Sequence, residues 1–441
     1  MAVRGPSSSS RPYQLIVFGA SGFTGRFVVE EVARSSAEVP GGKLTWAIAG
    51  RSRDKLEKVL QEAAQQLDKL QVDRQEIGAE GKPELQSEVE IIVADVSEPD
   101  SLAAMCKLGL VILNCVGPYR FYGEPVVKAC VENGAHCVDI SGEPQYLESM
   151  QLSYGAAAAD GGVYIVGSCG FDSIPADLGV IYTRDQFKGT LTAVESFLTA
   201  SSGPEGSCIH DGTWQSAVYG VADSDKLRSL RKKFNHKPLP VVGAKIKRRS
   251  TLFYSNEIQQ YTIPFMGSDP SVVKRTQRFL FEEHQQTPVQ YGAYAGVGGI
   301  SSVIKLLFAG FIFFLLVKFS FGRNLLIKFP EFFSCGYFSK AGPSRKQMEG
   351  SSFRFAFFGE GYSDGQDPSQ GKPDAKIRTL VQGPEAGYVA TPIAMVQAAL
   401  TILTEPDALP KRGGVYTPGA AFAKTSLIKR LDQHGIHFSV L

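Results

Sequence analysis

The sequence predicts an α/β protein: a doubly wound parallel sheet, followed by a second, mixed α+β domain that carries an apolar, hairpin-like insertion. Three observations predict this class. Strand and helix patterns alternate through the first third of the chain, and the strands are apolar throughout, as in a parallel sheet covered on both faces. Closely spaced glycines follow the first strand pattern, and turn-rich β patterns follow Gly170. A length of 441 residues suits two to three domains.

The alternating patterns assign the first domain to residues 13–180, after a polar tail at 1–12. A polar, aperiodic stretch at 71–88 indicates a mobile insertion. The strands are expected at 13–18, 43–49, 89–94, 109–114, 136–140 and 162–167, and the helices at 24–35, 53–70, 98–106, 123–134 and 144–159.

The second domain is expected over 181–388, with β patterns at 190–200 and 252–265. Beyond it, 390–403 has the pattern of a strongly amphipathic helix, and 426–433 that of another helix. These two helices could pack back on the first domain, so that the segment 389–441 completes it.

The segment 14–25, QLIVFGASGFTG, has the pattern with which a nucleotide-binding strand passes into a helix. Gly19 would form the tight turn, Gly22 would bring bare backbone against a pyrophosphate, and Gly25 would let the helix pack closely on the sheet. Free N–H groups at the helix start would face the phosphates. The first domain is therefore predicted to be Rossmann-like and to bind a dinucleotide through Gly19, Ser21, Gly22, Phe23, Thr24 and Gly25.

A basic stretch follows the second strand pattern. NAD-binding folds usually place an acidic residue here for the ribose hydroxyls, whereas this chain has Arg51, followed by Ser52 and Arg53. Because a guanidinium suits a 2′-phosphate, we expect Arg51 and Ser52 to bind NADP(H) in preference to NAD(H). The alternative is that these are basic residues at the solvated start of a helix.

Another polar loop follows the strand expected at 109–114. Ligands of open parallel sheets lie beyond the carboxyl ends of the strands, so Asn114 and Gly117 are predicted to lie over the cofactor. Tyr119, in the same loop, is a candidate for proton transfer to the substrate. The alternative is a plain connection between a strand and a helix.

Carboxylates and hydroxyls also follow the next two strands. Asp139, Ser141 and Glu143 could supply a general acid or base near the nicotinamide end, or could cap the helix that follows. Asp172 or Ser173 is expected to cap a further helix, whether or not either side chain also meets the substrate.

His210 is the second candidate for proton transfer, because a histidine titrates near neutral pH and Asp211 stands beside it. Neighbouring side chains usually diverge, however, so the pair could equally have no shared role. The sequence contains no serine-elbow, P-loop or metal-binding motif, and no metal is predicted.

The segment 292–317 is apolar apart from Lys305, and its last twelve residues are uninterrupted in apolar character. Twelve helical residues span about 18 Å, less than the roughly 30 Å of a bilayer core. We therefore expect a helix, a bend and a second apolar arm over 292–338 that associate with a membrane or lipid surface. Ten Lys or Arg and no acid at 226–249 could meet anionic headgroups. The alternatives are a core or dimer-interface helix and a solvated basic loop.

Composition limits the remaining possibilities. The net charge of +2 gives no reason to expect nucleic acid as a partner. Seven scattered cysteines without a CxxC pair are typical of reduced thiols, and the polar amino terminus lacks a secretory signal. We expect a cytosol-facing protein that is not secreted.

The motifs GASGFTG, AGRSRDKL, NCVGPYRFYGEPVV, DISGEP and GFDSIPADLG occur in this order. With them the chain resembles the saccharopine dehydrogenase family, and in particular its saccharopine dehydrogenase-like oxidoreductases. The resemblance implies a Rossmann domain completed by carboxyl-terminal segments, a nicotinamide cofactor, a homodimer in some members, and association with lipid droplets and mitochondria. It supports the cofactor roles of Gly19 to Gly25 and Arg51.

These observations predict an NAD(P)H-dependent oxidoreductase that transfers hydride to or from a carbonyl, imine or enoyl group of a small-molecule or lipid-like substrate. The alternative is a non-catalytic scaffold or redox sensor on a lipid surface that retains the nucleotide-binding fold.

Overall fold

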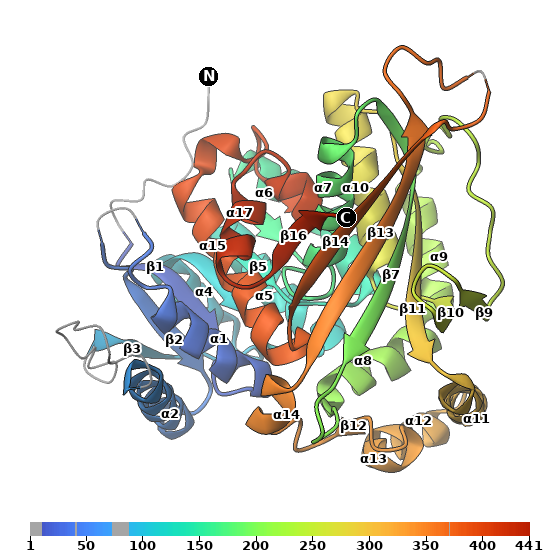
Figure 1. Ribbon diagram of the computed structural model, residues 1–441. Helices are drawn as coiled ribbons and strands as arrows, with labels where there is room; N and C mark the ends of the chain where they lie inside the picture. The colour runs from blue at the N-terminus through green and yellow to red at the C-terminus, as the bar shows by residue number, and fades with distance from the viewer. Residues whose placement is uncertain (1–10, 40–41, 73–87, 370) are drawn as a thin grey trace.

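The computed structural model describes residues 11–39, 42–72, 88–369 and 371–441. Most of the predicted polar tail, and nearly all of the predicted insertion at 71–88, lie outside these residues. Two seven-stranded sheets dominate the molecule and lie side by side (Figure 1).

The first sheet has the order β15-β6-β5-β4-β1-β2-β3, and every strand pairing in it is parallel. The chain runs outward from β1 to β3 and then returns to place β4 on the other side of β1, so the strand order reverses between β1 and β4. Open parallel sheets bind ligands at this reversal, beyond the carboxyl ends of the strands. The strands are β1 Tyr13–Phe18, β2 Trp46–Gly50, β3 Glu90–Val93, β4 Gly109–Asn114, β5 His136–Asp139, β6 Tyr164–Val166 and β15 Gly414–Tyr416.

Helices cover both faces of this sheet, as the alternation of patterns predicts. Along β1, Leu15 and Val17 join one apolar core and Ile16 and Phe18 the other, because successive side chains of a strand point to opposite faces. The helices are α1 Phe23–Arg34, α2 Arg53–Val72, α4 Pro99–Leu108, α5 Tyr119–Asn133, α6 Pro144–Asp160 and α7 Ile174–Gln186.

The second sheet has the order β16-β14-β13-β7-β11-β10-β9 and is mixed, since β7 and β11 pair in parallel and the other pairings are antiparallel. A short two-stranded sheet joins β8 to β12. These strands are β7 Thr190–Ser201, β8 Ile209–His210, β9 Phe253–Ser255, β10 Gln260–Pro264, β11 Gln290–Gly298, β12 Phe338–Ser339, β13 Ser352–Tyr362, β14 Ala375–Pro384 and β16 His437–Val440. The accompanying helices are α8 Asp211–Ala222, α9 Ser224–Lys233, α10 Asp269–His284 and α14 Arg345–Glu349.

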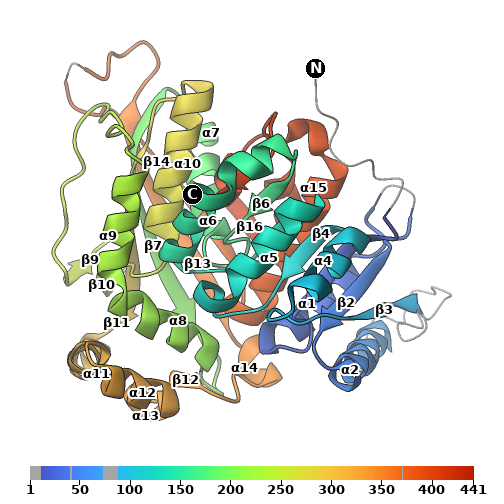
Figure 2. The same cartoon turned by 180° about the vertical axis from the view of Figure 1, so that it is seen from behind.

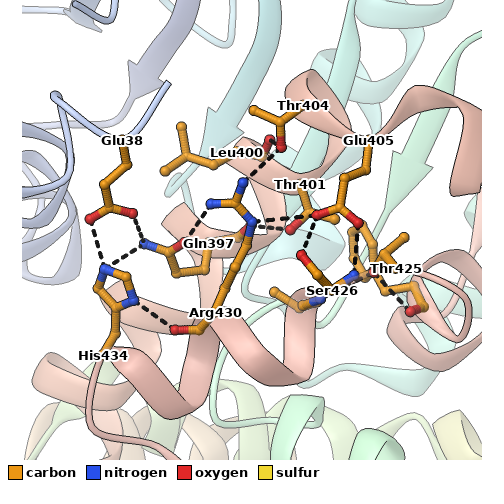
Figure 3. A network of polar contacts seen from close by, with 12 residues as sticks. Glu38, Gln397, Leu400, Thr401, Thr404, Glu405, Thr425, Ser426, Arg430 and His434 are labelled. Carbon is orange, nitrogen blue, oxygen red and sulfur yellow. Dashed lines mark hydrogen bonds and ion pairs between the residues drawn. The ribbon is translucent and has the colours of Figure 1, made fainter. Parts of the chain in front are cut away.

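The carboxyl-terminal segment contributes to both sheets, with β15 beside β6 and β16 beside β14. Helix α15 Thr391–Thr404 precedes β15, and helices α16 Pro418–Phe422 and α17 Leu427–Gln433 lie between β15 and β16 in the chain. A polar network ties this segment to the loop after α1: Gln397 and His434 both contact the Glu38 carboxylate, at 3.2 and 2.7 Å (Figure 3). The prediction that 390–403 is amphipathic is wrong, because α15 is buried on nearly every side within the first domain's core.

The apolar segment at 292–317 is also divided differently from the prediction. Residues 292–298 belong to strand β11 inside the second sheet, so they cannot extend a helix towards membrane-spanning length. Helices α11 Ile300–Val317, α12 Ser320–Lys328 and α13 Pro330–Phe333 follow, in the predicted sequence of helix, bend and second arm. They lie together along one edge of the molecule, below α8 in Figures 1 and 2.

Two helical segments among the described residues are long and apolar enough to cross a membrane. Ala386–Thr404, which contains α15, is 78% buried and is a core helix, whereas Ile300–Val317 is only 11% buried. The two segments are similar in length and apolar composition, and only their burial shows that the first is a core helix while the second is exposed.

Candidate functional site

The loop between β1 and α1 is closed so tightly that side chains are excluded at its glycines. Gly19 has φ +81°, and a Cβ at Gly25 would collide with the Gly19 carbonyl oxygen. A Cβ at Gly22 would lie 3.1 Å from that same oxygen. No side chain caps the first turn of α1, where Gly22 is the N-cap residue. Backbone N–H groups therefore remain at this helix start, as a pyrophosphate requires.

Arg51 stands at the end of β2, where the sequence predicts recognition of a 2′-phosphate. Its side chain is exposed and forms no hydrogen bond or ion pair with another described residue. It faces Asp95, whose pKa is lowered first by the Ser97 backbone N–H and to a smaller extent by the Arg51 charge. Ser52 is half-buried at the start of α2. A free guanidinium at this edge fits the phosphate group of NADP.

Asn114 ends β4 at the point where the strand order reverses. Its side chain is fully buried, and its Oδ1 accepts a hydrogen bond from the Val116 N–H at 3.1 Å. Its Nδ2 has no partner among the described residues. An unpaired buried donor is costly, and a bound cofactor at this edge would supply an acceptor. Gly117 follows in the same loop.

The Tyr119 hydroxyl links the backbone at the end of β4 to the backbone just after β5. It donates to the Asn114 carbonyl oxygen at 2.8 Å and receives a long hydrogen bond from the Ile140 N–H at 3.4 Å. Burial, with the Asp139 charge nearby, raises the pKa of Tyr119 well above its ordinary value. This placement favours a positioning role over the predicted proton transfer.

Glu143 is neither a free general acid nor a helix cap, the two alternatives that its position suggests. The side chain is 2% exposed and does not cap α6. Its Oε1 accepts from the Tyr119 N–H and the Ser216 hydroxyl, both at 3.0 Å, and its Oε2 pairs with Arg120 Nε at 2.9 Å. Arg120 in turn pairs with Asp223 at 2.8 Å. Glu143 therefore anchors α8 to the carboxyl edge of the sheet.

Asp139 also has a structural role. Its Oδ1 accepts hydrogen bonds from the Ser141 N–H and hydroxyl and from the Ser168 N–H, while its Oδ2 accepts from the Tyr146 hydroxyl. Burial raises its pKa and these hydrogen bonds oppose the rise. The carboxylate thus joins the loops that follow β5 and β6.

A group of buried carboxyls lies where α7 meets α10. Ser173 does not cap α7 as predicted; its hydroxyl instead forms a hydrogen bond with the Ser268 hydroxyl at 2.9 Å. This contact brings together the neighbouring residues Asp172 and Asp269. Burial raises the pKa of Asp172 to about 6. The sequence analysis missed Asp269, which is 1% exposed and whose oxygens have no hydrogen-bond partner of good geometry among the described residues.

His210 is brought directly onto the glycine loop. Its ring stacks on the Phe23 ring with centroids 4.5 Å apart. Its Nδ1 accepts a hydrogen bond from the Gly212 N–H at 3.2 Å, and Asp211 lies 3.5 Å from the same nitrogen. Burial lowers the pKa of His210. Because Nδ1 accepts the hydrogen bond from the Gly212 N–H, the neutral imidazole carries its proton on Nε2. The His210 backbone N–H donates a hydrogen bond to the Tyr388 hydroxyl at 2.8 Å.

Outside this edge, the described residues offer a cavity but no metal site. No group of three His, Cys, Asp or Glu residues in the described ranges could hold a metal ion. A cavity of about 290 Å³ lies behind the glycine loop, between α1, α2 and α14, with Arg26 and Arg345 among its lining residues. Phe23 and His210 stack on each other at the carboxyl edge of the first sheet. The sequence places these two residues in separate domains.

Comparison with known proteins agrees with this geometry. The family model described as the saccharopine dehydrogenase NADP binding domain matches residues 15–166. The chain is 61% identical to the human saccharopine dehydrogenase-like oxidoreductase over 436 residues, with 99% of each chain covered. It is 39% identical to a Caenorhabditis elegans protein named lipid droplet localized protein, with 97% of this chain and 98% of the relative covered.

A solved structure supports the fold. Apo saccharopine dehydrogenase (L-Glu forming) from Saccharomyces cerevisiae superposes with a TM-score of 0.54 at 12% identity, over 97% of this chain and 100% of that one. At this identity the likeness concerns the fold alone. The sequence relatives, which extend over the full chain, carry the assignment further: the chain belongs to the saccharopine dehydrogenase-like oxidoreductases, and its first domain is of their NADP-binding type.

Proposed function

We propose that this protein is an NADP(H)-dependent oxidoreductase that acts at a lipid surface on the carbonyl, imine or enoyl group of a lipid-related substrate. The observation that carries the proposal is the closed glycine loop beside a free Arg51 guanidinium, at the edge where the strand order of the sheet reverses. Bound NADPH would supply a hydride, and the protein would manage the accompanying proton.

The chain offers distinct groups for each task. Glycines 19, 22 and 25 would bring backbone against the pyrophosphate, Arg51 and Ser52 would hold the 2′-phosphate, and the unpaired Asn114 amide would face the cofactor from β4. Tyr119, whose hydroxyl donates a hydrogen bond to the Asn114 carbonyl oxygen, would hold the loop after β4 in place.

His210 is our candidate for the group that assists proton transfer to the substrate. A neutral imidazole whose Nδ1 already accepts a hydrogen bond carries its proton on Nε2 and can donate a hydrogen bond from it to a substrate oxygen or nitrogen on which negative charge develops. The stacked Phe23 ring holds the imidazole beside the glycine loop. Loss of turnover in His210→Gln with unchanged NADPH affinity would support this role, whereas full turnover in the variant would assign the proton to another group.

The lipid surface is proposed from the apolar platform, which we define as helices α11, α12 and α13. Its outward aromatic residues are strongly exposed, for example Phe308 at 66% and Phe332 at 77%. Three of its four charged residues are basic, which suits anionic headgroups. A relative that is 39% identical bears the name lipid droplet localized protein. We include in the proposal that the chain faces the cytosol on a lipid droplet or membrane.

The platform would lie in the surface and would not cross it. Val303 near the start of α11 and Val317 at its end are both buried against the protein, so the helix runs along the body. A helix of this kind inserts its outer face into the boundary between headgroups and acyl chains. Four of the ten basic residues at 226–249 form ion pairs, which leaves fewer for headgroups. The pairs are Lys226 with Asp223, Arg228 with Asp225, Arg231 with Glu148 and Arg249 with Glu195.

Titration of the purified protein with NADPH and NADH, followed by cofactor fluorescence, tests the oxidoreductase proposal first. We expect selective NADPH binding, and then NADPH oxidation in the presence of at least one long-chain aldehyde, imine or enoyl thioester. Binding without turnover on any of them would favour the alternative, a scaffold or redox sensor on a lipid surface. Absence of binding by a folded protein would refute the oxidoreductase proposal.

Flotation with phospholipid vesicles tests the surface. Replacing Phe308 and Phe311 by Asp should abolish flotation, while Met266→Asp, an equally exposed apolar position outside the platform, should not. If the double variant instead turns a dimer into a monomer in light scattering, the platform is an interface between two copies of the chain.

A further inference from the structure

Helix α8 lies across the carboxyl edge of the first sheet. At its start, the His210 ring stacks on Phe23 at the beginning of α1. In its middle, the Ser216 hydroxyl donates to Glu143, the residue that precedes α6. These contacts cross the ends of β1, β4 and β5, which are neighbours in the sheet. The helix therefore covers the edge at which a dinucleotide would enter.

The far end of α8 is fastened to the same edge. The Gln145 side-chain amide donates to the Gly220 carbonyl oxygen at 3.0 Å. Asp223, directly after the helix, pairs with Arg120 at 2.8 Å. Arg120 has a side chain only 8% exposed and is also bound to Glu143, so these contacts form one connected group. A ligand reaching the edge from this side must displace α8 or wait for it to move.

The opposite face of α8 packs on the apolar platform. Trp214 and Val218, one helical turn apart, are buried in one cluster with Val317 of α11 and Leu326 of α12. The Trp214 indole N–H donates to the Leu326 carbonyl oxygen at 2.9 Å. Ser216, about 200° around the helix from Trp214, points to the sheet. One helix thus has a face on the cofactor edge and a face on the platform.

We propose that α8 couples the platform to the cofactor edge, so that binding of a lipid surface opens this edge to the cofactor and to a substrate arriving from the lipid. This inference rests on the proposed oxidoreductase function and its lipid surface. In water α8 covers the edge and only a fraction of molecules can bind NADPH, which weakens the apparent affinity by that fraction. Lipid that engages the platform acts through the Trp214 contact and draws the part of α8 that follows Trp214 away from Glu143 and Arg120. His210 stays stacked on Phe23, and the fraction of molecules that can bind NADPH rises.

The linkage is reciprocal, because two ligands that favour the same state of α8 must strengthen each other's binding by the same factor. Lipid should therefore tighten NADPH binding, and NADPH should tighten lipid binding equally. Couplings of this kind usually change affinity by about 5-fold or more.

The test measures the apparent Kd for NADPH of the full-length protein with and without vesicles of phosphatidylcholine and phosphatidylserine. We expect vesicles to lower the Kd about 5-fold or more in the wild type. The Phe308→Asp, Phe311→Asp double variant should bind NADPH as the wild type does without vesicles and show no vesicle effect. Met266→Asp should retain the effect.

Trp214→Ala isolates the coupling itself. The platform's exposed face is untouched in this variant, so vesicles should still bind, yet they should no longer change the Kd for NADPH. If Trp214→Ala does not fold, Trp214→Phe, which keeps an aromatic ring but loses the hydrogen bond to Leu326, should show a reduced vesicle effect. Hydrogen exchange over 211–222 should increase on vesicle binding in the wild type only.

Each outcome separates this proposal from the previous one. Vesicle binding and NADPH binding that are each present but independent would overturn the coupling while leaving the oxidoreductase and its surface intact. Failure to bind vesicles, or failure to bind NADPH under either condition, would overturn the coupling together with the corresponding part of the proposed function.

Discussion

Replacement of Arg51 by Ala tests the cofactor site most directly. Because the exposed guanidinium makes no hydrogen bond or ion pair with another described residue, its loss removes only the weak electrostatic attraction to Asp95 from the folded protein. We therefore expect the free energy of unfolding to change by less than about 0.5 kcal/mol. The whole effect should fall on the bound cofactor.

The magnitude follows from the bond that would be lost. A hydrogen bond to a charged group contributes about 1.5–3 kcal/mol. At about 1.4 kcal/mol per tenfold change, Arg51→Ala should weaken NADPH binding by about 10- to 140-fold. NADH has no 2′-phosphate, so its Kd should change less than about 2-fold, within the few tenths of a kcal/mol expected of an exposed site. The carboxylate of Asp95, which Arg51 faces, would no longer be balanced and would add to the loss for NADPH.

The assay is a fluorescence titration of both cofactors at physiological ionic strength, since salt weakens exposed charge pairs. Arg53→Ala is a matched control: it removes the same charge two residues away, but that guanidinium donates to the Ile91 carbonyl oxygen at 3.2 Å. We expect the control to retain most of its NADPH selectivity. Equal weakening of NADPH and NADH by Arg51→Ala, or no weakening of either, would refute the recognition of a 2′-phosphate by Arg51.

Three further predictions concern other parts of the first domain. Gly25→Ala should weaken NADPH binding at least about 10-fold in the same titration, because its Cβ collides with the Gly19 carbonyl oxygen and opens the loop. Burial raises the pKa of Asp177 from 3.8 to about 6, so the native state holds this proton more tightly than the unfolded chain and stability falls as pH rises from about 4 to about 6. Asp177→Asn should lessen this fall by about 2 kcal/mol between pH 4 and pH 7, as measured by denaturant unfolding at the two pH values. Glu143→Gln leaves the buried Arg120 short of its partner and should lower the free energy of unfolding by about 3–5 kcal/mol in urea.

Each of these has an outcome that contradicts it. Gly155→Ala, at a helical glycine with open space around its Cβ, is the control for Gly25, and similar effects of the two would remove the special role of the loop. An unchanged pH profile in Asp177→Asn would mean that this carboxyl is ionised in the native protein at low pH. A Glu143→Gln variant as stable as the wild type would show that the group around Arg120 does not depend on the Glu143 charge.

The sequence by itself determined the first sheet and its cofactor edge. Local apolar patterns at 13–18 and 109–114 became β1 and β4 with the same bounds, because strands buried on both faces leave continuous apolar runs. The glycine spacing likewise predicted the closed loop, since Gly25 is required by a contact only a few residues away. Short-range causes of this kind can be read from a short window of sequence.

Other elements needed the tertiary structure. Strand β15 has three residues and pairs with β6, roughly 250 residues earlier in the chain, so no local pattern marks it. Helix α15 was predicted to be amphipathic and is buried on nearly all sides. In the apolar segment, residues 292–298 are a strand because β7 offers a parallel partner, which composition cannot reveal.

The site divides in the same way. The sequence placed Asn114, Glu143 and Asp172 at one edge, because all three follow parallel strands and such strands end together. Only the tertiary structure brought His210 onto Phe23 and Asp269 beside Asp172. The reason is physical: a buried ring or carboxyl takes its environment from whatever packs against it, and here those neighbours come from segments far away in the chain.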